Sequence, residues 1–311
     1  MKVVPIFIKS FILTLISLSL YAQSSIKPVP NAIYNSLRAE LGKKLFFEPM
    51  ISKDGTISCA SCHNLPGNGA NSIQYSFGVD TQEGLINTPT VLNATFNFVQ
   101  HFNGQAKTLQ EQVLLPITNP LKMATTIKMV LSKLKNSKYK DEFERIYPDG
   151  LNEKNFANAI SEFEKALTTP NSKFDQFLRG ETHLSRQELL GYKQFKSTGC
   201  INCHNGVNIG GGMYQKMGIF IKYKEAKKLN GRIDITKRER DKNVYKVPTL
   251  RNIAITAPYF HDGKIVTLKQ AIRKMREHQL GITLRSKSIE NIEAFLKTLT
   301  GETPKILQGM K

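Results

Sequence analysis

Cysteine is scarce in this sequence, with four residues among 311, and tryptophan is absent. All four cysteines stand in two copies of one pattern, Cys-x-x-Cys-His, at Cys59–His63 and Cys200–His204. This placement leaves no cysteine for a disulfide framework. It argues against a zinc site, which would gather four cysteines without a histidine after each pair. It also argues against a thioredoxin-like dithiol, which has no following histidine and is rarely duplicated.

The pattern Cys-x-x-Cys-His is typical of covalent haem c attachment. Its spacing follows from the chemistry, because two thiols must reach the two vinyl groups on one edge of a porphyrin. The next residue then places its imidazole under the iron as the proximal ligand. We therefore predict two covalently bound haem c groups. The thioether cysteines are Cys59, Cys62, Cys200 and Cys203, and the proximal iron ligands are His63 and His204.

Long hydrophobic runs are lacking beyond the N-terminus. The apolar run Phe11–Tyr21 follows Lys2 and Lys9 and precedes Ala22. It is shorter than the about 20 residues that span a bilayer, and the pattern favours a cleaved secretory signal over a membrane anchor. We predict a signal peptide over residues 1–22 and no membrane span after its removal. A periplasmic location follows, since bacteria attach haem covalently outside the cytoplasm.

Acidic residues are few: 25 Asp and Glu stand against 44 Lys and Arg, which gives a formal net charge of +19. Such an excess is usual for a solvated, lysine-rich surface. It also suits electrostatic steering of a small acidic redox partner. No basic block is interleaved with aromatic residues, so nucleic acid is not an expected partner.

Strand patterns are lacking as well, and apolar residues recur at helical spacing instead. We predict a mainly α fold, with capping boxes at Thr108 and Ser185 starting two of the helices and Pro116 interrupting the first of these. The break at Thr169–Ser172 divides the chain into two domains, 23–172 and 173–311, with one haem motif each. The other predicted helices cover 31–47, 125–147, 152–167, a segment after Thr267, and 289–299.

Beyond the two motifs, the chain resembles the bacterial di-haem cytochrome c peroxidase family, which includes the oxidase that matures methylamine dehydrogenase. The resemblance covers nearly everything after the signal. It implies two mainly α, cytochrome c-like domains, the first with the peroxidatic haem and the second with the electron-transfer haem. The matching blocks are Leu45–Phe47, Ser58–His63, Asn87–Asn93, Pro248–Asn252, Ala257–Gly263 and Ala294–Gly301.

The resemblance also implies the activity. Hydrogen peroxide is reduced at the haem of His63, and electrons enter at the haem of His204 from a small cytochrome c or copper protein. Met275 matches the family's thioether ligand of the second iron, although on residues alone a methionine on an apolar helix face is more often core packing. A His/Met pair raises the iron potential, which suits an electron-accepting relay. A homodimer is left open.

The resemblance further implies a calcium ion between the domains. The side-chain oxygen of Asn87 and the backbone carbonyls of Thr256 and Pro258 would bind it, and such oxygen ligands suit a hard cation. On residues alone, Asn87 is a turn residue.

Four departures from the family pattern bear on catalysis. The distal histidine expected near Ser76–Val79 is replaced at Val79, so we expect no sixth ligand at the first iron. The distal glutamate, a general acid–base group, is replaced by Lys122, while the neighbouring amide Gln112 is retained. Phe102 stands where the inter-haem tryptophan is expected. The Asp and Arg that flank the glycine of that motif are replaced by Asn103 and Gln105.

Three functions remain open on these residues. The first is a peroxidase in which Gln112 and Lys122 serve the distal site, with Glu111 or Glu83 as alternative proton carriers. The second is an oxidase of another substrate, although Met275 argues against the relative that uses tyrosine there. The third is a di-haem electron carrier whose peroxide site has decayed. Among the remaining histidines, His101 is assigned a surface or structural role, and His183 and His278 are expected to be exposed. His261 lies in the matched block Ala257–Gly263 and is expected to support the second haem.

Overall fold

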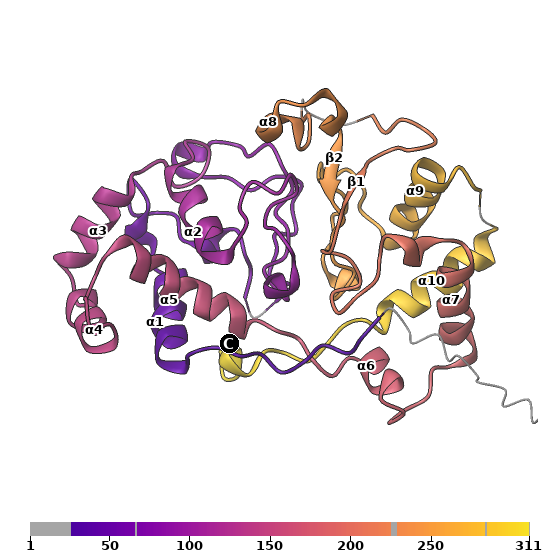
Figure 1. Ribbon diagram of the computed structural model, residues 1–311, viewed down its shortest axis with the longest axis horizontal. Coiled ribbons are helices and arrows are strands. Elements are labelled where there is room, and N and C mark those ends of the chain that lie inside the picture. The colour runs from indigo at the N-terminus through magenta and orange to yellow at the C-terminus, as the bar shows by residue number, and fades with distance from the viewer. Residues whose placement is uncertain (1–25, 66, 225–228, 284, 311) are drawn as a thin grey trace, which may run out of the picture.

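The computed structural model describes residues 26–65, 67–224, 229–283 and 285–310, and it is mainly helical. Figure 1 shows two lobes joined along one edge by extended segments. The first lobe contains α1 (Ser36–Phe46), α2 (Leu109–Thr118), α3 (Ile127–Lys135), α4 (Tyr139–Ile146) and α5 (Glu153–Ala166). The second contains α6 (Lys173–Leu178), α7 (Arg186–Ser197), α8 (Ile233–Thr236), α9 (Leu268–Leu280) and α10 (Ser286–Lys297). The strands β1 (Tyr214–Lys216) and β2 (Val244–Lys246) pair antiparallel, with Tyr214 opposite Lys246.

Short 3₁₀ turns complete the fold, and each haem motif contains one. They are η1 (Pro49–Ile51), η2 (Cys59–Ser61), η3 (Val79–Thr81), η4 (Ala94–Phe96), η5 (Cys200–Asn202), η6 (Glu239–Asp241), η7 (Ile253–Ile255) and η8 (Lys305–Leu307).

A pair of crossed helices forms the framework of each lobe. The helix before the haem motif packs on a later helix, α1 on α5 and α7 on α10. A glycine stands at each crossing. A Cβ added to Gly42 would lie 1.9 Å from the carbonyl oxygen of Ala159, and one added to Gly191 would lie 1.9 Å from that of Asn291. Only glycine permits this backbone approach, so the two lobes share the same kind of helix crossing.

Each lobe has its own hydrophobic core. The segment that begins the described chain packs in the second core, and the segment near its end packs in the first. The first core gathers the large side chains of α1, α4 and α5, and it includes Leu307 from the end of the chain. The second gathers those of α6, α7, α9 and α10, and it includes Ile26. Figure 1 shows the indigo and yellow segments running past each other beneath the lobes. The domain division at residue 172 stays a prediction. The sequence did not predict that Ile26 packs in the second core and Leu307 in the first.

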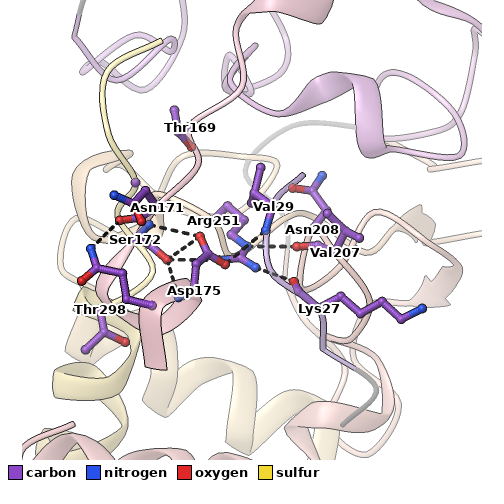
Figure 2. Close-up of polar contacts among 12 residues, drawn as sticks. Lys27, Val29, Thr169, Asn171, Ser172, Asp175, Val207, Asn208, Arg251 and Thr298 are labelled. Atoms are coloured by element: carbon purple, nitrogen blue, oxygen red, sulfur yellow. Dashed lines mark hydrogen bonds and ion pairs between the residues drawn. The ribbon is translucent and has the colours of Figure 1, made fainter. Parts of the chain in front are cut away.

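A buried ion pair lies at the junction of the lobes (Figure 2). The Arg251 guanidinium lies 2.7 Å from the Asp175 carboxylate, and both side chains are fully buried. Arg251 also donates to the carbonyls of Val207, at 3.0 Å, and Lys27, at 2.9 Å. The backbone N–H of Val29 donates to Asp175 at 3.2 Å. The pair therefore ties the N-terminal segment to the second lobe.

Thr169 lies at the same junction. Its hydroxyl accepts hydrogen bonds from the amides of Asn93, at 2.7 Å, and Asn252, at 2.9 Å. Both asparagines have left-handed backbone conformations, φ 59° and 62°. Asn93 of the first lobe and Asn252 of the second thus bind the connecting segment through the same hydroxyl group.

Several helix predictions are confirmed and some are wrong. The Ser185 capping box is present, and α5 covers 153–166 as expected. Pro116 does not interrupt α2, which continues to Thr118. At Thr108 only half of the capping box forms, because the Glu111 carboxylate accepts from the backbone N–H of Lys107. The segment 125–147 forms two helices, α3 and α4, and the short strands were missed because three residues are too few to show alternation.

The described part of the chain contains no helix that is long and apolar enough to cross a membrane. The predicted signal peptide, residues 1–22, lies outside the described residues.

Candidate active site and haem centres

The first haem motif forms a tight turn that points its ligating groups in one direction. The backbone N–H groups of Cys62 and His63 both donate to the Cys59 carbonyl, at 3.1 and 3.0 Å. His63 Nδ1 lies 3.0 Å from the Gly69 carbonyl oxygen. This contact fixes Nδ1 as the donor and leaves Nε2 available to a metal.

A cavity of about 500 Å³ opens above this turn. The two cysteines and His63 form one wall, and α2, α5 and the loop that follows α2 form the others. Among its lining residues are Cys59, Cys62, His63, His101, Phe102, Gln112, Pro116, Lys122 and Glu164. Apolar walls with a few inward polar groups are typical of a cofactor site.

Burial shifts the pKa of several groups that line the cavity. Burial lowers the pKa of His63 to about 4, so the imidazole is neutral and can bind iron. Burial raises the pKa of the Cys59 thiol and lowers that of the Lys122 ammonium. Burial lowers the pKa of His101 to about 3, with the positive charge of Lys122 adding to the effect.

The second haem motif repeats this geometry. His204 Nδ1 lies 3.3 Å from the Ile209 carbonyl oxygen, and burial lowers the pKa of His204 to about 4. Cys200 and Cys203 flank the same kind of turn. Both centres therefore fit haem c: two partly exposed free thiols stand beside a neutral imidazole whose second nitrogen is held by a backbone carbonyl.

The repeat extends beyond the motifs. Residues 88–93 and 247–252 follow the same course behind their haem motifs. Thr90 and Thr249 each donate their hydroxyl, at 2.7 Å, to an asparagine carbonyl that follows the motif. A second pair of segments, 100–106 and 259–265, is closed in each case by an antiparallel bridge between its ends.

This second pair of segments meets between the lobes. Phe102 of the first segment occupies the position of His261 in the second, and their ring centroids lie 6.3 Å apart. Tyr245 stacks on His261 with centroids 4.2 Å apart and planes 22° apart. Phe102, which stands where the family tryptophan was expected, thus links the first cavity to the second lobe.

The same correspondence pairs α2 with α9. Thr108 and Thr267 each accept a hydrogen bond as the N-cap of these helices. Counting from the two caps, Pro116 of α2 takes the place of Met275 in α9. Pro116 lines the cavity above His63. A proline side chain has no atom that binds iron, whereas the side chain of Met275 carries a thioether.

The predicted distal residues lie together, and one partner was missed. Gln112 and Lys122 both line the cavity, whereas Val79 is buried and donates its backbone N–H to the Lys122 carbonyl at 2.8 Å. Gln112 contacts the carboxyl group of Glu164, which was not predicted. The alternative proton carriers are both exposed and line no part of this cavity: they are Glu83 and Glu111.

The residues expected at a calcium ion lie near the contact between lobes. Asn87 donates its backbone N–H to the His261 carbonyl at 2.9 Å, as Lys246 does to the Phe102 carbonyl at 2.7 Å. The Asn87 amide donates to the carbonyls of Ile73 and Gln74, at 3.2 and 3.1 Å. The described residues include no cluster of three or more His, Cys, Asp or Glu. The set Asn87, Thr256 and Pro258 remains a prediction.

Two histidine predictions have clear outcomes. His183 is exposed, as expected. His278 is buried rather than exposed, because it lies on the inner face of α9 with Nδ1 2.8 Å from the Ile221 carbonyl oxygen.

Comparisons with known proteins agree with this geometry. Residues 36–183 match the family model described as di-haem cytochrome c peroxidase. The chain is 46% identical over 273 residues to the cytochrome c551 peroxidase of Nitrosomonas europaea, covering 87% of this chain and 82% of that protein. The chain belongs to the di-haem cytochrome c peroxidase family.

Further relatives show the same relationship. The cytochrome c551 peroxidase of Pseudomonas aeruginosa is 39% identical, covering 92% of this chain and 87% of that protein. A crystal structure of a MauG-like protein associated with microbial copper homeostasis has the same fold, with a TM-score of 0.78 at 24% identity, covering 89% and 93% of the two chains. The chain is thus a cytochrome c peroxidase with two haem c groups, a cytochrome donor and peroxide as substrate.

Proposed function

We propose that hydrogen peroxide is reduced in the cavity above His63 and that electrons enter at the centre of His204. The net reaction takes one peroxide, two electrons and two protons to two waters. The observation that carries this assignment is the difference between α2 and α9, with Pro116 at the position that Met275 holds in the second lobe. An open side is needed for a substrate, whereas a closed His/Met centre suits electron transfer.

The proposed binding roles follow from the two turns. Cys59, Cys62, Cys200 and Cys203 would hold the porphyrins as thioethers, His63 and His204 would bind the irons, and Met275 would bind the second iron from α9. The haem iron supplies the redox chemistry when bound. The protein supplies neutral imidazoles, a mostly apolar cavity and the polar groups that would meet the peroxide.

Gln112 and Lys122 are the proposed polar contacts of peroxide. The Lys122 side chain reaches the cavity, and its positive charge would attract a peroxide that is losing a proton. An ammonium donates hydrogen bonds but accepts none, so Lys122 alone does not replace the proton-accepting function of the family glutamate.

We propose an electron-transfer route between the two centres from the contacts between the lobes. Phe102 and His261 lie on the line from one lobe to the other, in place of the missing tryptophan. A calcium ion held by Asn87, Thr256 and Pro258 would stiffen this region. The donor is proposed to be a small acidic cytochrome c or copper protein that is steered by the +19 charge of the chain. A periplasmic location and a homodimer belong to the same proposal.

Steady-state peroxide consumption with a reduced cytochrome c tests this function. We expect turnover of roughly 1–10³ s⁻¹, loss of activity in His63→Gly, and slower turnover as salt screens the approach of the donor. Oxidation of the donor without consumption of peroxide would contradict this assignment and would instead identify a di-haem electron carrier.

A further inference from the structure

A buried carboxyl group in the peroxide cavity has no role in the mechanism above. Glu164 lies in the last turn of α5, is 3% exposed and lines the cavity with Gln112 and Lys122. The Gln112 amide nitrogen donates to both carboxylate oxygens of Glu164, at 3.0 and 3.1 Å, when the amide is turned toward them. With the amide turned the other way, its oxygen would accept a hydrogen bond from the protonated acid. One neighbour therefore serves both protonation states.

The location of Gln112 places this pair on the open side of the first centre. Gln112 is one helical turn before Pro116, and Pro116 stands where α9 carries Met275. Side chains one turn apart share a helix face. Glu164, which contacts Gln112, therefore lies at the part of the cavity where peroxide would be bound once the haem is in place.

The surroundings of Glu164 favour the neutral acid without excluding the anion. No cation forms an ion pair with it among the described residues, and burial raises its pKa to about 8. The titratable groups around it are Cys59 of the first haem motif and, across the cavity, His63, His101 and Lys122. A proton-transfer group works best when its pKa lies near the working pH.

We propose that Glu164 is the proton-transferring residue of peroxide reduction in this chain, with Gln112 as its positioning residue, in place of the carboxylate that position 122 lacks. This rests on the proposed function of the cavity. Glu164 gives its proton to the outer peroxide oxygen as the O–O bond breaks, and the bonding electron pair leaves with the first water. The Glu164 carboxylate then takes the proton of the inner oxygen. Two electrons from the donor and two protons from solvent convert that oxygen to the second water.

The variant Glu164→Gln, in the protein with both haems, tests the proposal. It keeps the size and polarity of the side chain but carries no transferable proton. We expect turnover to fall by about 10²–10⁴-fold, while haem content and the rate of electron transfer from the reduced donor to the protein, measured without peroxide, stay unchanged. The dependence of turnover on the ionisation of Glu164 should vanish. The double variant Glu164→Gln with Lys122→Glu should recover part of the lost turnover.

Glu162→Gln is the matched control on the same helix. Glu162 is also buried, but it pairs with Lys165 at 2.6 Å and lines no part of the cavity. We expect its turnover to stay within twofold of the wild type. If Glu164→Gln turned over peroxide like the wild type, the role of Glu164 would be refuted. The activity of the wild-type protein would still support peroxide reduction in the cavity.

A spectroscopic measurement decides the matter if Glu164→Gln fails to fold. The infrared carbonyl band of a protonated carboxyl group should be present in the wild type at pH 7. It should disappear with a midpoint near the Glu164 pKa of about 8, and addition of cyanide, an anion that enters the open side, should shift it. Absence of such a band between pH 6 and 8, or indifference of the band to cyanide, would refute the assignment.

Discussion

At the scale of single residues, the sequence predicts the covalent and proximal positions of the haems, but it does not predict Glu164. The haem pattern is local, because five adjacent residues carry all its chemistry. Glu164 stands four residues after Ile160 and next to Phe163, on a face that the spacing assigns to the core. In the sequence, a single acidic residue at such a position looks like one at the solvent-exposed edge of a helix. Only its contact with Gln112 from α2 shows that it belongs to the cavity.

Burial of Glu164 predicts a pH dependence of stability. The pKa of its carboxyl is raised from 4.5 to about 8 by burial. Between these values the folded protein keeps a proton that the unfolded chain releases, so stability falls as pH rises through this window. Relative to Glu164→Gln, the wild type should lose up to about 1.4 kcal/mol for each pH unit. Urea unfolding of both proteins at pH 5, 6.5 and 8 measures this, and a difference that is independent of pH would contradict it.

At the scale of elements, the helices with strong caps were predictable and the effect of Pro116 was not. Ser185 and Thr267 start α7 and α9 as the sequence indicates. Pro116 was expected to end its helix because proline removes one backbone hydrogen bond. It stands two residues before the end of α2, so the helix loses little by keeping it. The correspondence between α2 and α9 is visible in the sequence only after the caps Thr108 and Thr267 are aligned.

The correspondence of α2 with α9 predicts the result of placing a thioether at position 116. Pro116→Met should give the first haem a sixth ligand, because Met275 holds the equivalent position in the second lobe. We expect the oxidised protein to change from high-spin to low-spin iron at this haem, to bind cyanide more slowly and to lose most turnover. Pro116→Leu is the control, since it supplies similar bulk without sulfur. Equal spin states in the two variants would show that the side chain does not reach the iron.

At the scale of the whole molecule, the sequence indicates two haem units but not how their ends are exchanged. Each unit consists of a haem motif, a crossed helix pair and a capped helix. The sequence signals for these parts lie within short segments of the chain. The exchange of Ile26 and Leu307 between the two cores depends on contacts between residues far apart in the sequence. Hydrophobic periodicity contains no information on such pairing, so the sequence led to the predicted boundary near residue 172 but gave no sign that the segments at Ile26 and Leu307 cross.

The buried pair of Arg251 and Asp175 should hold the exchanged N-terminal segment to the second lobe (Figure 2). Arg251→Met removes the cation and leaves Asp175 as a buried charge, which typically costs about 3–5 kcal/mol. It also frees the Lys27 carbonyl, so proteolysis near residue 27 should become faster.

Two controls separate the buried charge from the loss of packing. Replacing both partners, Arg251→Met with Asp175→Asn, should recover a large part of the loss, because no unpaired charge remains in the interior. Breaking the more exposed pair of Lys173 and Glu188 by Lys173→Met should cost less than about 1 kcal/mol. Urea unfolding of the three variants measures these differences. If the single variant were no less stable than the double, burial of an unpaired carboxylate would not be the cause, and the junction would depend on the hydrogen bonds of Arg251 to the backbone instead.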